Sequence, residues 1–282
     1  MEEDPYFALQ DYGIKDSEYG AIRGPYAKVG GAPEKHSEHT RVASLNMAKI
    51  SRRSLSVDLL CIILRNIVRT FQLDILCLQE LNHNNDDRRL AHFRAKLHDG
   101  GLLLTFQGAP GPYGANGRCW GGVAIITPTR WAGVQPEPRI IDEDKSGRML
   151  SKFIYLPIAH SADMMAVSSI YGVSGCTTEF PSNAKGQLRN EKMMRQAALV
   201  MKMDEGITRR TDISIICTDA NLLEFEDLDT SCTEGCRHEE GFLTQALNSL
   251  GYVDAIRSFY PDTRLYTFQD KNHKSYLDRI LV

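Results

Sequence analysis

RVASLNM (41–47) and DILCLQE (74–80) are two short apolar runs that each end in a polar residue, and together they indicate the class of fold. Between them, segment 54–71 (SLSVDLLCIILRNIVRTF) repeats apolar residues at intervals of three and four, which predicts a helix with one apolar face. Ser54 and Ser56 are the candidates for its N-cap. A strand, a helix and a second strand over this length form a βαβ unit, so we expect the two strands to be parallel.

The rest of the pattern predicts a mixed α/β domain. Helices are expected at 86–98, 185–204 and 240–250. Strands are expected at 102–106, 122–127, 151–158, 165–172, 212–217, 265–268 and 275–282. The close spacing of the strands between 102 and 172 favours antiparallel pairing. Residues 1–39 are rich in Gly, Pro, Tyr and charge without periodicity, so we expect a linker or poorly ordered arm before one domain at 40–282.

The composition is that of a soluble globular protein, with 42% hydrophobic and 24% charged residues in 282. A net charge of -3 argues against a general electrostatic attraction to nucleic acid, although a local basic groove would suffice for binding. Cys61, Cys77 and Cys217 lie in apolar runs and are interpreted as small buried side chains in a reducing compartment.

The sequence has neither a signal-peptide pattern at its start nor an apolar run of about 18 residues that would span a bilayer. We therefore expect an intracellular protein, with the nucleus among the candidate compartments, and no membrane association. The oligomeric state is left open by the sequence.

Polar residues follow four of the expected strands. Asn46, Glu80, Asp219 with Asn221, and Asp278 each stand where an apolar run ends. Ligand sites of α/β sheets gather at such strand ends, and carboxylate and amide oxygens suit Mg²⁺ bridged to phosphate. Taken singly, each residue has an ordinary interpretation, because Asp and Asn at strand ends usually cap helices or stabilise turns.

The order of the motifs adds a stronger signal than any one of them. They are SLNM (44–47), DILCLQE (74–80), GGVAII (121–126), SSIYG (168–172), DISIICTDAN (212–221), YTF (266–268) and SYLDRILV (275–282). This ordered set resembles the endonuclease/exonuclease/phosphatase superfamily over residues 41–282. YTF followed by SYLDRIL is most similar to the endonuclease domains of non-LTR retrotransposons, and the DRIL ending also resembles the inositol 5-phosphatases.

The resemblance implies a four-layer α/β sandwich, in which two packed mixed β-sheets are flanked by helices. It also implies Mg²⁺-dependent hydrolysis of a phosphodiester in DNA by in-line attack of water, with Mn²⁺ as an alternative ion. Asn46 and Glu80 would hold the metal, and Tyr171 would contact the scissile phosphate.

The same resemblance implies roles in the chemical step. Asp219 would orient or deprotonate the attacking water, and Asn221 would bind a phosphate oxygen and steady Asp219. The family's Gly-Asp-Phe/Leu-Asn motif stands here as Thr218-Asp219-Ala220-Asn221, which keeps both polar functions. Asp278 would pair with a histidine further along the chain and fix its tautomer.

The family's closing Ser/Asp-Asp-His segment does not occur between Asp278 and Val282, so we expect a domain incomplete at its C-terminus and without its last strand or strands. Loss of the imidazole would remove a hydrogen-bond donor worth roughly 3–4 kcal/mol by analogy with oxyanion holes. The expectation is a chain that binds metal and phosphate but turns over slowly.

Two other functions stay open. One is a phosphatase of inositol phosphates or phosphoinositides, although Tyr276 and Leu277 stand where that family has tryptophan and cysteine. The other is a non-catalytic relic of the same fold.

Several other signals favour structural roles over functional ones. Cys232, Cys236 and His238 lack the further ligands of a zinc site, and the cations of segment 185–204 suit a solvated face better than nucleic acid. His83 is interpreted as a loop residue without a functional role. Trp120 is interpreted as an aromatic side chain of the core or its rim. Gly121 and Gly122 are interpreted as a tight turn into a strand.

Overall fold

The computed structural model describes residues 40–47, 56–83, 88–108, 121–130, 147–155, 164–173, 184–211, 213–220, 242–263, 268–269, 274–275 and 278–282. The expected N-terminal arm at 1–39 lies outside these ranges. Within them, no helix is both long and apolar enough to cross a membrane.

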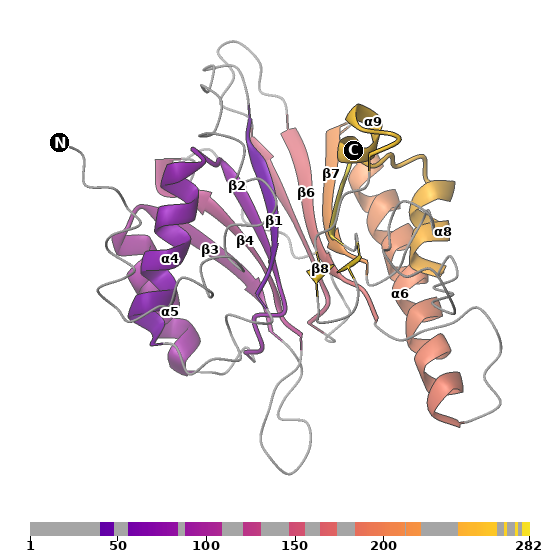
Figure 1. Ribbon diagram of the computed structural model, residues 1–282, viewed down its shortest axis with the longest axis horizontal. Helices are drawn as coiled ribbons and strands as arrows, with labels where there is room; N and C mark the ends of the chain where they lie inside the picture. The colour runs from indigo at the N-terminus through magenta and orange to yellow at the C-terminus, as the bar shows by residue number, and fades with distance from the viewer. Residues whose placement is uncertain are drawn as a thin grey trace.

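Two four-stranded mixed sheets form the centre of the molecule (Figure 1). The first sheet has the order β1 (Val42–Asn46), β2 (Ile75–Gln79), β4 (Val123–Pro128), β3 (Leu102–Gln107). The second has the order β10 (Asp278–Leu281), β7 (Ile213–Asp219), β6 (Met164–Tyr171), β5 (Met149–Tyr155). The pairs β1/β2 and β6/β7 are parallel, and the remaining pairs are antiparallel.

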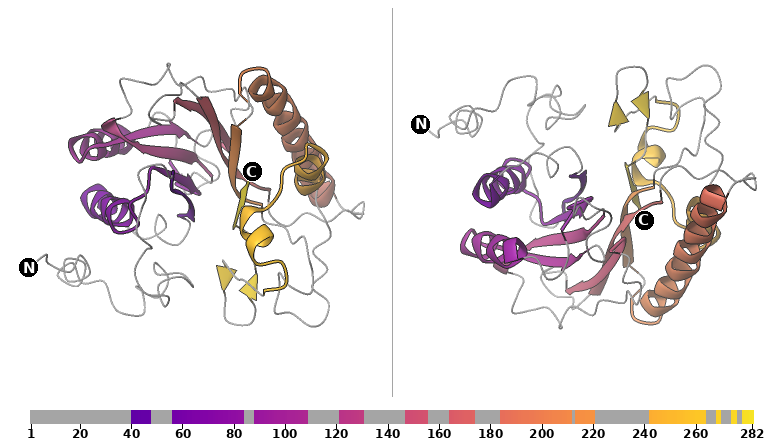
Figure 2. Two further views of the ribbon diagram at one scale, coloured as in Figure 1. Left: turned by 90° about the horizontal axis from the view of Figure 1, so that it is seen from above. Right: turned by 90° about the horizontal axis from the view of Figure 1, so that it is seen from below.

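Helices cover the outer face of each sheet, which completes the expected four-layer α/β sandwich (Figures 1 and 2). The first sheet carries α4 (Val57–Thr70) and α5 (Arg88–Asp99). The second carries α6 (Ala184–Thr208) and α8 (Phe242–Ser249), and α9 (Ala255–Phe259) precedes a short pair of strands, β8 (Phe268–Gln269) and β9 (Lys274–Ser275).

The strand alternation divides the core into layers. On β2, Leu76 and Leu78 pack against the helices of the first sheet, whereas Ile75 and Cys77 face the second sheet. Cys217 belongs to the same inter-sheet layer, and Cys61 lies in the helix-side cluster. All three cysteines are buried and free, as the sequence predicts.

The β1–α4–β2 unit is confirmed as a parallel βαβ unit. Ser56 is the N-cap, because its Oγ accepts a hydrogen bond from the amide of Leu59 at 3.1 Å. The helix therefore begins at Val57, three residues later than the expected start at 54.

Other expectations need correction. The strands expected at 122–127 and 151–158 do not pair with each other, because β4 and β5 belong to different sheets. The single strand expected at 275–282 is two elements, since β9 pairs with β8 and β10 pairs with β7. Helix α9 was not expected, and its five residues are too few for a periodic signal.

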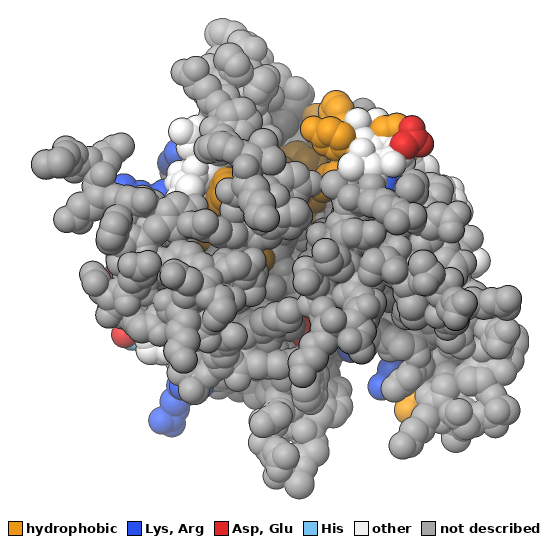
Figure 3. Space-filling model, in the orientation of Figure 1, with side chains coloured by type: hydrophobic (Ala, Val, Ile, Leu, Met, Phe, Trp, Pro, Cys, Tyr) orange, Lys and Arg blue, Asp and Glu red, His pale blue; other side chains and the backbone are white. Residues whose placement is uncertain are grey.

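Figure 3 shows hydrophobic side chains exposed near α9 and the C-terminus. Large exposed hydrophobic residues of this part of the chain are Val253, Phe259, Tyr260 and Val282. The backbones of Val253 and Val282 exchange two hydrogen bonds of 3.0 Å. Because β10 runs antiparallel to β7, this end of β10 lies away from the carboxyl end of β7.

Candidate active site

Four of the polar residues predicted from the sequence meet at one edge of the two packed sheets. Asn46 ends β1, Glu80 directly follows β2, Tyr171 ends β6 and Asp219 ends β7. The parallel pairs put two strand ends side by side in each sheet, with Asn46 in register with Gln79 and Tyr171 in register with Asp219. Face-to-face packing of the sheets then brings the two edges together.

The Asn46 amide joins carboxylates from opposite sheets. Its Nδ2 donates to Glu80 Oε1 at 3.1 Å and to Asp219 Oδ2 at 2.5 Å. The side chains of Glu80 and Asp219 are almost fully buried, at 7% and 2% exposure. A buried pair of carboxylates requires such a hydrogen-bond donor, or a cation, to offset the loss of hydration.

Tyr171 is held beside these carboxylates in its protonated form. Burial raises the pKa of its hydroxyl, and the Glu80 and Asp219 carboxylates raise it further, while the Arg148 cation acts in the opposite direction. The hydroxyl is hydrogen-bonded with Glu80. Tyr171 is therefore a hydrogen-bond donor across the whole physiological pH range.

Two residues that the sequence analysis missed fix the position of Tyr171. The Arg148 guanidinium lies 4.6 Å from the Tyr171 ring centroid, and its Nη1 donates to the Gly172 carbonyl at 2.9 Å. Gln196 Nε2 donates to the Tyr171 carbonyl at 2.9 Å. Gln196 lies on the buried face of α6, between the buried Met193 and Val200. A polar residue among the apolar positions of a helix was the sequence feature that could have indicated it.

The backbone at Glu80 adopts a conformation that few non-glycine residues take, with φ of 57°. The turn is held by the next residues, because the amides of Leu81 and Asn82 donate to the carbonyls of Gly122 and Gly121 at 3.1 and 2.6 Å. Gly121 and Gly122 have positive φ of 103° and 85°, respectively, which confirms the expected tight turn before β4. Strain of this kind, fixed by its surroundings, is typical of functional sites.

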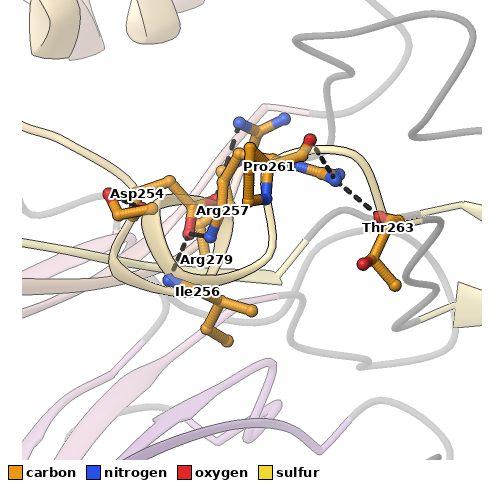
Figure 4. A network of polar contacts seen from close by, with 7 residues as sticks. Asp254, Ile256, Arg257, Pro261, Thr263 and Arg279 are labelled. Carbon is orange, nitrogen blue, oxygen red and sulfur yellow. Dashed lines mark hydrogen bonds and ion pairs between the residues drawn. The ribbon is translucent and has the colours of Figure 1, made fainter.

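Asp278 begins β10 directly opposite Asp219, so the two side chains lie on the same face of the sheet, toward the first sheet. The neighbouring Arg279 points to the other face, where its Nη1 lies 3.9 Å from the buried Asp254 Oδ2 (Figure 4). Asp254 also caps α9, and Arg257 of that helix donates to the Thr263 carbonyl at 2.6 Å (Figure 4). These contacts tie β10, and with it Asp278, to the outer layer.

The structure does not describe several other sequence candidates. Asn221 lies outside the described residues, as do Trp120, Cys232, Cys236 and His238. His83 follows Glu80 in the described loop and is half-buried. Within the described ranges, no three His, Cys, Asp or Glu residues form a group that would hold a metal without other ligands. The site consists of the Asn46 amide and the carboxylates of Glu80 and Asp219.

Several solved structures share this fold at low sequence identity. An AP endonuclease from Archaeoglobus fulgidus is 19% identical with a TM-score of 0.56, over 86% of each chain. A 3′ phosphatase, NExo, from Neisseria, bound to a product DNA hairpin, is 20% identical with a TM-score of 0.60, also over 86% of each chain. The catalytic domain of human Nocturnin is 16% identical with a TM-score of 0.54, over 86% of this chain and 82% of that one. Neither a protein-family model nor a curated protein matches the sequence.

Proposed function

We propose that this chain is a Mg²⁺-dependent phosphodiester hydrolase that acts on DNA. The observation that carries the proposal is the junction of Asn46 with Glu80 and Asp219, which gathers an amide and two buried carboxylates from both sheets. This donor set fits Mg²⁺, a hard cation that binds one or two carboxylates and keeps coordination positions for water and phosphate. Glu80 and the Asn46 amide oxygen would hold the ion.

Each protein group has a distinct task in the proposed reaction. Asp219 accepts the proton of the water that attacks phosphorus, while the bond from phosphorus to the leaving oxygen breaks and that oxygen takes a proton from solvent. The Tyr171 hydroxyl donates a hydrogen bond to a phosphate oxygen. A Mg²⁺ ion held by Glu80 and Asn46 would supply positive charge that offsets the charge on the phosphate. Asn221 is proposed to bind a second phosphate oxygen, and Asp278 to orient a catalytic imidazole.

DNA is the proposed substrate because the motifs YTF and SYLDRIL resemble retrotransposon endonuclease domains, and because the Neisseria protein of the same fold is bound to DNA. The proposed context is the endonuclease part of a retrotransposon-derived polyprotein. Inositol-phosphate hydrolysis and metal binding without turnover are the two competing outcomes.

Nicking of supercoiled plasmid tests the proposal. The wild type is expected to nick DNA in the presence of Mg²⁺ or Mn²⁺, and the nicking is expected to stop when EDTA removes the ion. Glu80→Gln is expected to lose this activity, while Glu205→Gln, which changes an exposed glutamate of α6, keeps it. Equal nicking by all three proteins, or hydrolysis of inositol phosphates in place of DNA, would overturn the proposal.

A further inference from the structure

A layer of buried and partly buried polar contacts joins the two sheets directly beneath the proposed site. Its members are Ser44 of β1, Gln79 of β2, Ser169 of β6 and the Cys217 carbonyl of β7, and we call them the inter-sheet clamp. These are the four strands that lead to Asn46, Glu80, Tyr171 and Asp219.

Gln79 is the centre of the clamp and is fully buried. Its Nε2 donates to Ser169 Oγ at 3.1 Å and to the Cys217 carbonyl at 3.5 Å, both in the other sheet. Its Oε1 accepts a hydrogen bond from Ser44 Oγ at 3.3 Å. Ser169 Oγ in turn donates to the Leu78 carbonyl at 3.0 Å, so the serine both accepts and donates across the interface.

The spacing along the strands links the clamp to the site. Ser44, Ser169 and Cys217 each lie two residues before a site residue, and Gln79 lies one residue before Glu80. Residues two apart on a strand share a face, at a separation of about 7 Å. The clamp is therefore the next polar layer below the Asn46–Glu80–Asp219 junction.

The junction depends on the distance and register between the sheets, because Asn46 and Asp219 belong to different sheets. Site geometry has to be held within roughly 0.5 Å to be productive. Apolar contacts alone permit sliding, whereas directional hydrogen bonds across the interface specify one register.

We propose that Gln79 is a positioning residue, anchored by Ser169, that sets the register of the two sheets and so holds Asn46 between Glu80 and Asp219. For its effect on catalysis, this inference rests on the proposed function. The placement of the Asn46 amide can be tested without it.

The chain offers a matched control in the neighbouring serine. Ser168 and Ser169 are both fully buried on β6, but they face opposite sides of the sheet. Ser168 Oγ lies 2.7 Å from Ser151 Oγ of the same sheet and 3.6 Å from Met203 Sδ of α6. Loss of either hydroxyl removes a buried hydrogen bond, but only loss of Ser169 touches the clamp.

The first readout is the side-chain amide signal of Asn46 in ¹H–¹⁵N NMR spectra, assigned with Asn46→Ala. Ser169→Ala and Gln79→Met are expected to shift this signal and to raise its hydrogen-exchange rate by at least about tenfold, because the amide loses a fixed partner. Ser168→Ala is expected to leave both unchanged. An unchanged Asn46 signal in the two clamp variants would overturn the inference, whether or not the chain cuts DNA.

The second readout is Mg²⁺-dependent nicking, with kcat and KM measured separately. Misplacement of a site by 1 Å costs up to about 100-fold, so kcat is expected to fall roughly 10- to 100-fold in the clamp variants with KM little changed. Ser168→Ala is expected to match the wild type after correction for the folded fraction. Equal kcat in Ser168→Ala and Ser169→Ala contradicts the clamp, whereas an inactive wild type contradicts the proposed function alone. If Gln79→Met does not fold, both the NMR and the nicking measurements are made on Ser169→Ala.

Discussion

Both ends of the interface between the sheets bury polar side chains, but the two ends satisfy them in different ways. At the site end, the neutral Gln79 amide has three hydrogen-bonding partners on three other strands. At the far end, Lys152 of β5 is 2% exposed and donates to Thr127 of β4 at 3.5 Å. Thr127 lies one residue beyond the pair of Ile126 with Leu76, near the start of β2.

The two ends therefore contribute differently to stability. Burial lowers the pKa of Lys152 from 10.5 to about 8, so below pH 8 the folded protein carries a buried ammonium group. A neutral amide with matched partners has a much smaller desolvation cost and gives direction to the packing. In the proposed account, the Gln79 end of the interface therefore sets the register of the sheets, whereas the Lys152 end lowers the stability of the fold.

The largest effect is expected at the site end from Asp219→Asn. Removal of the proposed proton acceptor should lower kcat for plasmid nicking by roughly 10²- to 10⁴-fold. Stability should change little, because the amide keeps the shape of the side chain and one hydrogen-bonding oxygen. Asp262→Asn, at an exposed position, is the control. A residual kcat within threefold of the wild type would exclude Asp219 from the chemical step.

At the far end, Lys152→Met should stabilise the protein and leave nicking unchanged. A pKa lowered from 10.5 to about 8 corresponds to roughly 3 kcal/mol of unfolding free energy, at about 1.4 kcal/mol for each pH unit. The cost is complete below pH 8, where the amine is protonated in both states. It disappears as pH rises through 10.5, because the unfolded chain then also loses the proton.

Urea denaturation at pH 7 and pH 10 measures this difference. The gap between Lys152→Met and the wild type should narrow to about 1 kcal/mol at pH 10. Lys152→Arg keeps its charge at both pH values and should be destabilised at both. A gap that does not depend on pH would show that the pKa of Lys152 is not lowered in the folded protein.

Gly172→Ala should damage the site end through crowding. A Cβ atom at this position would lie 2.3 Å from the Ala220 carbonyl oxygen and 2.9 Å from that of Asp219. Overpacking of this kind typically costs about 1–3 kcal/mol, and the shift should reach Asp219, whose carbonyl accepts from the Gly172 amide. Gly101→Ala, where φ is 79° but no atom lies closer than 3.8 Å, should lose stability and keep its kcat.

The smallest effect is expected from Tyr171→Phe. Loss of one hydrogen bond to phosphate should lower kcat by roughly tenfold, equal to about 1.4 kcal/mol. The raised pKa of Tyr171 means that the folded state keeps a proton that the unfolded chain releases above about pH 10. Wild-type stability should therefore fall faster than that of Tyr171→Phe above pH 10, as measured by denaturation at pH 9 and pH 11.

Local patterns in the sequence were sufficient for much of the fold and for part of the site. The apolar runs before Asn46 and Glu80 and the helix between them specify a parallel pair, so both side chains are expected at one sheet edge. The motif order then indicated Tyr171 and Asp219 as site residues, and the structure places both at the corresponding edge of the second sheet. Their roles in binding and chemistry remain proposals.

The contacts between the sheets were not predictable in the same way. Gln79 and Ser169 are 90 positions apart, and no local period indicates which faces of which strands will meet. The same limit applies to Lys152, which appears in the sequence only as one charge inside an apolar strand. The division of 275–282 between β9 and β10 likewise depends on which partner strand is available.

Calorimetric titration with Mg²⁺ tests the central claim most directly, because it asks whether the junction of the two sheets binds the ion. Wild type and Glu205→Gln are expected to bind one Mg²⁺ per chain with equal affinity. Glu80→Gln should lose at least about tenfold in affinity, since a carboxylate ligand is replaced by an amide. Equal Mg²⁺ affinity in all three proteins would contradict a metal site at Glu80 and Asn46.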